Sequence, residues 1–142
     1  MKIAIGSDHR GYALKQELAA YLRGKGHQIE DCGTHGQAPC DYPEYAQAVC
    51  RRVIEGKAER GILLCNSGIG MDMAANKFRE IRAAYCDNPA AAKYSRMHNN
   101  ANVLVLGAAF VKPVPAKRIV AMWLKTAFEG GRHLKRISMF SC

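Results

Sequence analysis

Short runs of Ile, Val and Leu alternate with longer segments of helical periodicity along the chain, and this alternation strongly limits the folds open to it. The pattern is typical of β-α-β units built around a parallel sheet. Each run is apolar throughout, as in strands whose two faces are both covered by helices. The sequence therefore predicts five strands, over residues 2–6, 28–32, 61–65, 82–86 and 103–106.

The segments between these runs have the spacing of amphipathic helices. Residues 12–24 carry apolar side chains at Leu14, Leu18 and Leu22 and end at Gly24, a residue that suits a helix C-terminus. Four further helices are expected over residues 43–55, 70–76, 89–97 and 115–129. If the basic segment 132–137 is helical, its two arginines project from one face.

The length of 142 residues suits one hydrophobic core, so we expect a single domain over residues 1–142. The predicted architecture is α/β: a three-layer, Rossmann-like (flavodoxin-like) domain with a C-terminal helical extension. Its five-stranded parallel sheet is expected in the order 2-1-3-4-5.

The formal net charge of +9 favours an acidic partner. The basic residues form only short groups, and no aromatic residues are interleaved with them as stacking platforms for bases. A small phosphorylated ligand is therefore favoured over nucleic acid, whose binding would weaken steeply with salt.

Cysteine and histidine spacing gives no sign of a disulfide framework or a metal site. The six cysteines form no CxxC pair, and no signal-peptide pattern precedes the first predicted strand. We expect reduced thiols, a cytoplasmic protein, and neither a metal nor a cofactor. The longest uncharged stretch, near residues 99–111, is too short to span a bilayer, so no membrane partner is expected.

Two loops, after the first and third predicted strands, carry candidate chemistry. Ligands of parallel sheets bind beyond the carboxyl ends of the strands, where these loops would be neighbours. The first holds Asp8 and His9; the second holds Cys65 and Ser67 among glycines whose backbone N–H groups could converge on an oxyanion. A helix N-terminus favours the thiolate, although a cysteine ending a buried strand is more often a small hydrophobe, and Asp8 could equally be a helix cap.

A third candidate region ends the fourth predicted helix and continues into the basic C-terminal segment. His98 and Asn99 lie at that helix end, and Arg132 and Arg136 follow a Gly-Gly pair. A solvated helix end and a solvated basic face are the structural alternatives.

Five motifs, taken in order, resemble the type B ribose-5-phosphate isomerases, a family that includes the subunits of galactose-6-phosphate isomerase. They are residues 6–11, 33–34 with 41–43, 65–70 with 74–77, 95–99, and 130–133. The resemblance runs nearly end to end. It implies aldose–ketose isomerisation of a sugar phosphate through an enediol, as in the pentose phosphate pathway. It also implies a homodimer or tetramer whose sites are shared between subunits.

The resemblance assigns a role to each candidate residue. His98 would open the sugar ring while Asp8 exchanges protons with the hydroxyls, and Cys65, oriented by Ser67, would carry the proton between C2 and C1. Some members use a glutamate where this chain has Met71, which leaves Cys65 as the base. The residues that would bind substrate are His9, Tyr42, Asn66, Gly68, Ile69, Gly70, Asn99, Arg132 and Arg136.

Asn66, Asn100 and Ala109 stand where many members have glycine, aspartate and arginine. The resemblance implies ribose 5-phosphate as substrate. These three departures leave a hexose 6-phosphate of the allose or galactose type as the alternative. A flavin-binding electron carrier would need an aromatic partner for the ring, whereas Trp123 is expected in the core. A non-catalytic subunit that needs a partner chain is the remaining alternative.

Overall fold

The computed structural model describes residues 1–140, so Cys142, one of the cysteines expected to be reduced, lies outside the described range. The strands within this range are β1 (Lys2–Ser7), β2 (Gln28–Asp31), β3 (Arg60–Cys65), β4 (Ala83–Tyr85) and β5 (Val103–Gly107). The helices are α1 (Tyr12–Gly24), α2 (Tyr42–Ile54), α3 (Ile69–Ala75), α4 (Pro89–Asn99), α5 (Pro113–Lys125) and α6 (Arg132–Ile137). The five cysteines of residues 1–140 are free thiols.

Every predicted strand and helix is present, with shifts at the ends. The range of α1 is the predicted one, because its apolar stripe and terminal glycine mark both limits. Helix α5 begins earlier than expected, with Pro113 in the first turn, where a missing N–H is tolerated. It also ends earlier, at Lys125, because the backbone of Thr126 is extended; the Thr126 hydroxyl donates to the Met122 carbonyl at 2.7 Å.

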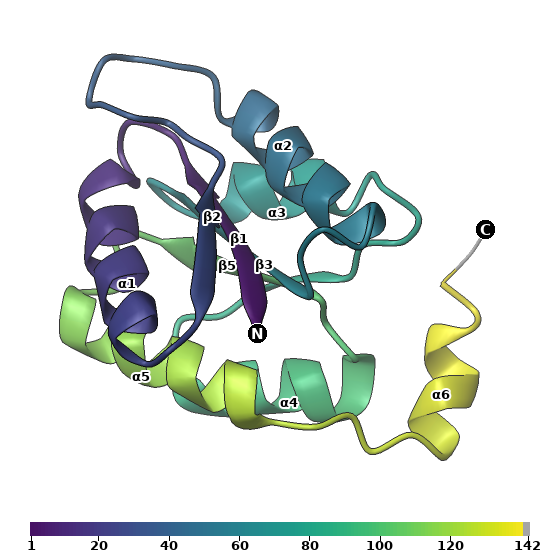
Figure 1. Ribbon diagram of the computed structural model, residues 1–142. Coiled ribbons are helices and arrows are strands. Elements are labelled where there is room, and N and C mark those ends of the chain that lie inside the picture. The colour runs from purple at the N-terminus through teal and green to yellow at the C-terminus, as the bar shows by residue number, and fades with distance from the viewer. Residues whose placement is uncertain (141–142) are drawn as a thin grey trace.

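The sheet is all parallel, as predicted, but the predicted strand order 2-1-3-4-5 is wrong. The order is β2-β1-β3-β5-β4, so β5 pairs with β3 and leaves β4 at one edge. Figure 1 shows β2 beside β1 at the other edge. The reason is burial, since all five residues of β5 are buried, whereas the three residues of β4 are only partly buried. A wholly apolar strand is stabilised most in the interior of a sheet.

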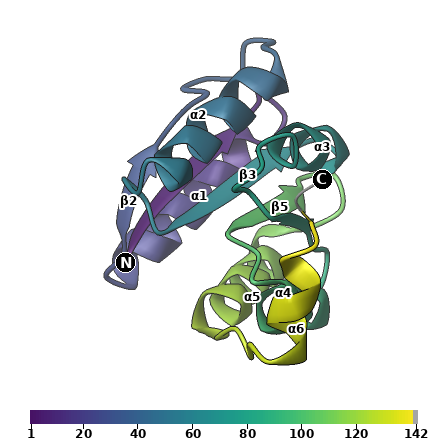
Figure 2. The same cartoon turned by 90° about the vertical axis from the view of Figure 1, so that its right-hand side faces the viewer.

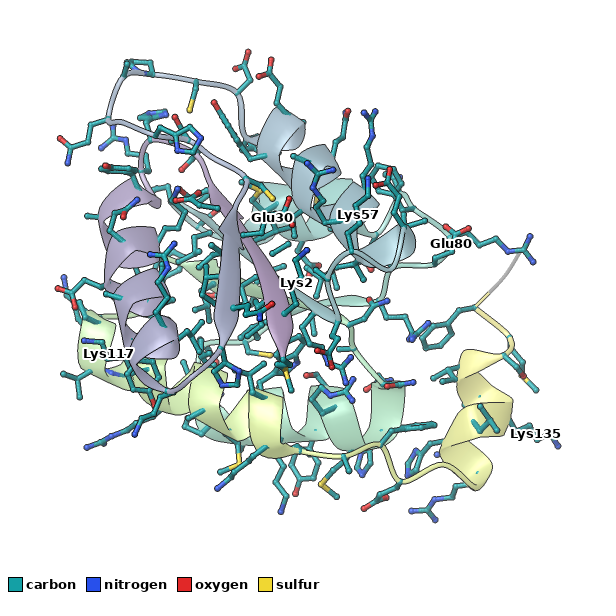
Figure 3. All side chains as sticks on the ribbon, viewed as in Figure 1. Lys2, Glu30, Lys57, Glu80, Lys117 and Lys135 are labelled. Carbon is teal, nitrogen blue, oxygen red and sulfur yellow. The ribbon has the colours of Figure 1, made fainter. Side chains whose placement is uncertain are left out.

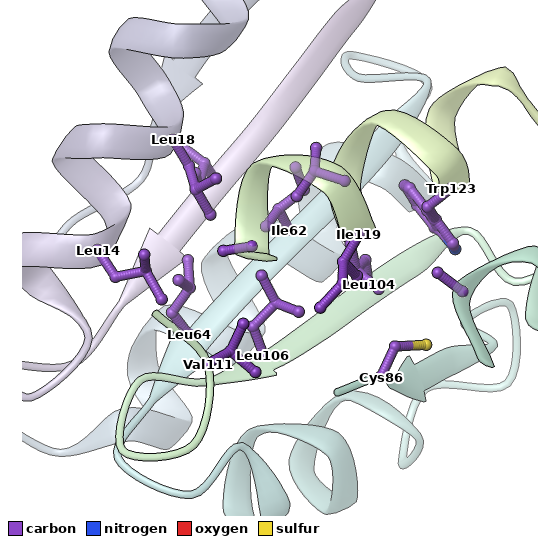
Figure 4. Packing of buried hydrophobic residues seen from close by; sticks show 14 of the residues in the cluster. Leu14, Leu18, Ile62, Leu64, Cys86, Leu104, Leu106, Val111, Ile119 and Trp123 are labelled. Atoms are coloured by element: carbon purple, nitrogen blue, oxygen red, sulfur yellow. The ribbon is translucent and has the colours of Figure 1, made fainter. Parts of the chain in front are cut away.

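Alternate residues of the strands supply two cores, one on each face of the sheet. On one face, α1, α4 and α5 cover Ile62, Leu64, Leu104 and Leu106, with Trp123 fully buried as expected (Figure 4). On the other face, α2 and α3 cover Ala4, Leu63, Val103 and Val105. These layers confirm the predicted three-layer α/β fold.

The segment after α5 crosses the end of α4 and forms α6, which packs against α4 (Figure 2). This is the expected C-terminal helical extension. Charged side chains cover the outer surfaces of the helices (Figure 3). Within residues 1–140, no helix is long and apolar enough to cross a membrane.

Candidate active site

The loops that follow β1 and β3 lie side by side at the carboxyl edge of the sheet, as predicted. Strands β1 and β3 are paired, and the backbone N–H of Asp8 donates to the carbonyl of Leu64 at 3.2 Å. A Cβ on Gly11 would lie 2.7 Å from that same carbonyl oxygen. Glycine is therefore needed at position 11 for the first loop to approach the end of β3 this closely.

Cys65 is the last residue of β3, and its thiol points into the loop that starts α3. The side chain is buried, and its sulfur accepts a hydrogen bond from the backbone N–H of Gly68 at 3.1 Å. Gly68 adopts φ +83°, a left-handed conformation that glycine adopts without strain. The loop therefore offers the sulfur a donor that would also stabilise a thiolate.

Three other cysteines are poorly suited to proton transfer. Burial raises the pKa of Cys50 to about 12 and the pKa values of Cys32 and Cys86 to about 11. The thiols of Cys32 and Cys86 donate to backbone carbonyls at 3.9 and 3.6 Å, whereas the sulfur of Cys65 accepts. Its environment therefore separates Cys65 from these thiols.

Tyr42 lies over the glycine loop from the start of α2. A Cβ on Gly70 would come within 2.6 Å of the Tyr42 ring, so the ring sits directly against the backbone of that glycine. The hydroxyl of Ser67 accepts from the Ile69 N–H at 3.3 Å, while the Ile69 side chain is exposed. Met71 is fully buried and packs into the core beneath α3.

Asp8 is held rigidly in the first loop. Its side chain is buried, and Oδ1 accepts from the backbone N–H groups of Arg10 and Gly11, both at 2.9 Å. Asp8 therefore closes the turn before α1 without capping the helix, because Gly11 occupies the cap position and no side chain bonds there. Oδ2 has no hydrogen-bond partner among residues 1–140 and is the oxygen available to a ligand.

His9 extends the first loop toward the segment before α2. Its Nδ1 accepts the backbone N–H of Cys40 at 3.2 Å. That bond places the proton of the neutral ring on Nε2, because a nitrogen that accepts cannot carry a hydrogen. Nε2 is thus the nitrogen free to donate to an anion.

The remaining predicted residues lie at the opposite edge of the sheet. His98 and Asn99 end α4, and the loop that follows them reaches the start of β3, where Asn102 accepts from the Gly61 N–H at 2.9 Å. Strand β3 runs over six residues from this edge, at Arg60, to Cys65, a length of about 16 Å. Arg132 and Arg136 lie on α6, close enough to influence the ionisation of His133 (Figure 1).

The structure therefore divides the predicted site residues into two groups. The carboxyl-edge group contains Asp8, His9, Tyr42, Cys65, Asn66, Ser67, Gly68, Ile69 and Gly70. The α4–α6 group contains His98, Asn99, Arg132 and Arg136. One chain does not bring the two groups together.

A cavity of the described chain lies away from both loops. It is found beside the edge strand β4, and its lining includes Asn76, Arg82, Asn99 and Ile137. In the Cys65 loop, Asn66 and Ile69 are exposed, whereas Cys65 and Gly68 are buried.

One residue that supports the site was missed in the sequence. Lys15 is fully buried in α1, and its ammonium donates to Oδ1 of Asp31 and, at 2.7 Å, to the carbonyl of Thr34. The segment that it fixes pairs with the end of β1, where Ser7 donates to Gly33 at 2.7 Å. A lysine next to Leu14 on the apolar stripe of α1 is the signal that could have revealed this role.

The three departures from the family pattern have different structural settings. Asn100 adopts φ 49° at the end of α4, a left-handed position that asparagine tolerates well. Asn66 and Ala109 face each other across two loops, since the Ala109 N–H donates to the Asn66 carbonyl at 2.9 Å. Both side chains are exposed beside Cys65.

Comparison with known proteins gives one consistent answer. A sequence model described as Ribose/Galactose Isomerase matches residues 3–140. Ribose-5-phosphate isomerase B of Escherichia coli is 46% identical, with 96% of this chain and 91% of that protein covered. D-erythrulose-4-phosphate isomerase of Pectobacterium atrosepticum is 42% identical, with 92% and 87% covered. The structure of Clostridium thermocellum ribose-5-phosphate isomerase B superposes with a TM-score of 0.98 at 47% identity, with 99% and 95% covered.

A parallel α/β sheet with a thiol and a carboxylate on adjacent loops at its carboxyl edge, together with these matches, defines an enzyme of the sugar-phosphate isomerase class. The chain belongs to the ribose/galactose isomerase family. Membership confirms the predicted resemblance and disfavours the flavin-carrier alternative.

Proposed function

We propose that the protein interconverts ribose 5-phosphate and ribulose 5-phosphate, with Cys65 as the base. The observation that carries this proposal is the hydrogen bond from the Gly68 N–H to the Cys65 sulfur at 3.1 Å. As a thiolate, Cys65 takes the proton from C2 of the open-chain aldose, and the electron pair of that C–H bond forms the enediolate. The same proton returns to C1 while the proton of the C2 hydroxyl passes to the oxygen on C1, which gives the ketose.

The backbone of the loop stabilises the enediolate. N–H groups between Asn66 and Gly70 offer donors at the end of β3, and one such donor is typically worth about 3 kcal/mol in a transition state. Ser67 and Tyr42, on either side of this backbone, orient the thiol and a sugar hydroxyl. Ile69 and Asn66 border the sugar.

Ring opening and phosphate binding use both groups of residues. His98 donates a proton to the ring oxygen while Oδ2 of Asp8 accepts one from the anomeric hydroxyl. His9, Arg132 and Arg136 hold the phosphate, because guanidinium groups match phosphate oxygens well. Asn99 contacts a sugar hydroxyl.

This chemistry needs a homodimer. The carboxyl-edge group and the α4–α6 group lie at opposite edges of one chain, so a complete site draws the first from one copy and the second from another. A twofold axis then gives two equivalent sites per dimer. Exposed apolar residues near both groups support such an interface, namely Ile69, Met73, Tyr94 and Leu134.

A pentose phosphate is the preferred substrate in this proposal. The E. coli and C. thermocellum proteins are named for ribose 5-phosphate, whereas the Pectobacterium protein is named for a tetrose phosphate, so the family scaffold accepts sugars of different length. The exposed side chains of Asn66 and Ala109 are where a different sugar would be accommodated. Their presence supports a hexose 6-phosphate as the second candidate.

The test is a coupled assay on ribose 5-phosphate, allose 6-phosphate and galactose 6-phosphate, with Cys65→Ala and Cys50→Ala compared. We expect turnover of the pentose, at least a thousandfold loss of kcat in Cys65→Ala, and retained phosphate binding. Cys50→Ala, a buried thiol far from the loop, should keep kcat. Preference for a hexose would show that the proposed substrate is wrong and the reaction type is right. Full activity of Cys65→Ala would show that Cys65 is not the base.

A further inference from the structure

A second chemical cluster joins the end of α4 to the start of α6. Oε2 of Glu129 lies 3.4 Å from Nε2 of His133 and 3.9 Å from Nε2 of His98. The two imidazole rings are stacked, with centroids 4.2 Å apart and planes inclined by 9°. The three potential ligand atoms all lie within 4.8 Å of one another.

The ring nitrogen Nε2 of His133 is buried and has no hydrogen-bond partner within the described chain. The side chain is more than nine-tenths buried. A buried polar atom left unpaired is destabilising, which makes an absent ligand a natural explanation. That nitrogen faces the same space as the carboxylate of Glu129.

Backbone hydrogen bonds hold together the segments that carry the three residues. The Glu129 N–H donates to the carbonyl of Met97 at 3.1 Å, which ties the carboxylate to the helix turn that carries His98. The His133 N–H donates to Gly130 at 3.0 Å within a turn where Gly130 and Gly131 have φ of +70° and +54°. Two elements far apart in sequence thus hold one preformed cluster.

We propose that His98, Glu129 and His133 form a binding site for a divalent transition-metal ion such as Zn²⁺. This proposal departs from the expectation of no metal site, which rested on spacing along the chain.

Two imidazoles and one carboxylate are a ligand set that zinc accepts, with a fourth position left for water. Zinc–ligand distances of about 2.0–2.1 Å place tetrahedral ligand atoms about 3.3 Å apart. The Glu129 and His133 atoms already meet this spacing. The side chains of His98 and Glu129 are 35% and 47% exposed. Small rotations of these side chains therefore suffice to bring all three ligand atoms to this spacing. Hard cations such as Mg²⁺ and Ca²⁺ prefer all-oxygen sites and are not expected here.

The local charges influence affinity in both directions. Arg132 and Arg136 lie close to His133 and oppose a cation, whereas the Glu129 carboxylate attracts one. Burial, followed by His98 and Arg132, lowers the pKa of His133, the direction that favours the neutral ring needed for coordination. The ring centroid of Tyr94 lies 5.1 Å from that of His98.

Metal binding would occupy the His98 nitrogen that the proposed function uses for ring opening, so Zn²⁺ should inhibit isomerisation. This consequence, unlike the site itself, rests on the proposed function.

The experiment titrates the metal-free full chain with Co²⁺ and follows the visible absorption of the bound ion. Zn²⁺ affinity is then measured by competition with a chromophoric chelator. We expect a four-coordinate cobalt spectrum without thiolate charge transfer and displacement by Zn²⁺. Glu129→Gln should weaken binding at least tenfold and His133→Asn should abolish it. Glu80→Gln, an exposed carboxylate on the loop before β4, is the matched control and should bind as the wild type (Figure 3).

Failure of Co²⁺ to bind, a thiolate band, or equal affinity in Glu129→Gln would each overturn the site. His133→Asn is interpreted only if its circular dichroism matches the wild type, and Glu129→Gln decides the question otherwise. Binding at the cluster without inhibition of the isomerase would leave the metal site standing and count against the role of His98 in ring opening.

Discussion

Gly68 donates its backbone N–H to the sulfur of Cys65 and does so from a left-handed conformation pressed against the ring of Tyr85. A Cβ at this position would lie 2.7 Å from two ring carbons of Tyr85. The left-handed backbone of Gly68 and its close contact with Tyr85 both leave no room for a Cβ. A side chain at position 68 would therefore move the N–H that donates to Cys65.

The first prediction concerns that link. Gly68→Ala should lower kcat at least tenfold and the free energy of unfolding by about 1–3 kcal/mol, because φ near +83° strains any residue with a Cβ. Steady-state kinetics and urea denaturation measure the two effects. Gly24→Ala, in open space at the end of α1, is the control and should change neither. Normal kcat in Gly68→Ala would show that the donor is dispensable.

The buried ammonium of Lys15 should matter for stability more than its position on a helix suggests. Lys15→Met removes one partner of a buried ion pair and leaves the Asp31 carboxylate, whose side chain is only 20% exposed, without its cation. Loss of about 3–5 kcal/mol in the free energy of unfolding is expected, with part recovered in Lys15→Met/Asp31→Asn. Chemical denaturation of the three proteins gives the answer, and a loss below about 1 kcal/mol would contradict it.

Asp72 on α3 should make stability depend on pH. Burial raises the pKa of its carboxyl above the ordinary 3.8, although hydrogen bonds from the Tyr85 backbone and Asn76 act in the opposite direction. The folded state therefore holds this proton to higher pH than the unfolded state. The contribution of Asp72 to the free energy of unfolding therefore falls as pH rises above 3.8. It stops falling once the carboxyl of the folded protein has ionised.

Asp72→Asn removes this titration while preserving the shape of the side chain. We expect it to raise the free energy of unfolding at pH 7 by about 1 kcal/mol or less, and to remove the fall in stability that begins above pH 3.8. Denaturation curves from pH 3.8 upward test the effect, with exposed Glu80→Gln as the comparison. A profile unchanged from the wild type would mean that the Asp72 pKa is not raised.

Arg132 on α6 should act through phosphate binding. Arg132→Ala removes charge-assisted hydrogen bonds to a dianion, so KM should rise about tenfold or more, with a smaller loss in kcat because the phosphate also positions the sugar. Lys135→Ala, another exposed cation of α6, serves as the matched control. An unchanged KM in Arg132→Ala would show that Arg132 does not bind the phosphate.

Local features of the fold were readable from the sequence, and long-range ones were not. The range of α1 and the positions of all five strands follow from apolar spacing and terminal residues, which are properties of neighbouring residues. The exchange of β4 and β5 depends on which strand gains more from a central place in the sheet, and that competition becomes visible only when the burial of both is known.

The candidate site shows the same division. Asp8 and Cys65 could be paired in advance because β1 and β3 are neighbours in either strand order. The separation of His98 from Cys65 could not be seen, since it depends on the direction in which α4 runs. The cluster of His98, Glu129 and His133 escaped notice because His98 comes from α4, whereas Glu129 and His133 flank the turn at Gly130 and Gly131, beyond β5 and α5.

The most direct test of the shared site is complementation between two inactive variants. Cys65→Ala and His98→Gln are each expected to be inactive. When they are unfolded together, refolded as a mixture and assayed on ribose 5-phosphate, half of the dimers are mixed, and each mixed dimer has one intact site. We therefore expect about one quarter of the wild-type activity.

The control pairs Cys65→Ala with the double variant Cys65→Ala/His98→Gln, a mixture in which no intact site can form. It should stay at the level of the inactive parents. Recovery of about one quarter in the first mixture alone would establish a site built from Cys65 of one copy and His98 of the other. A first mixture as inactive as its parents, with mixed dimers present, would contradict the shared site.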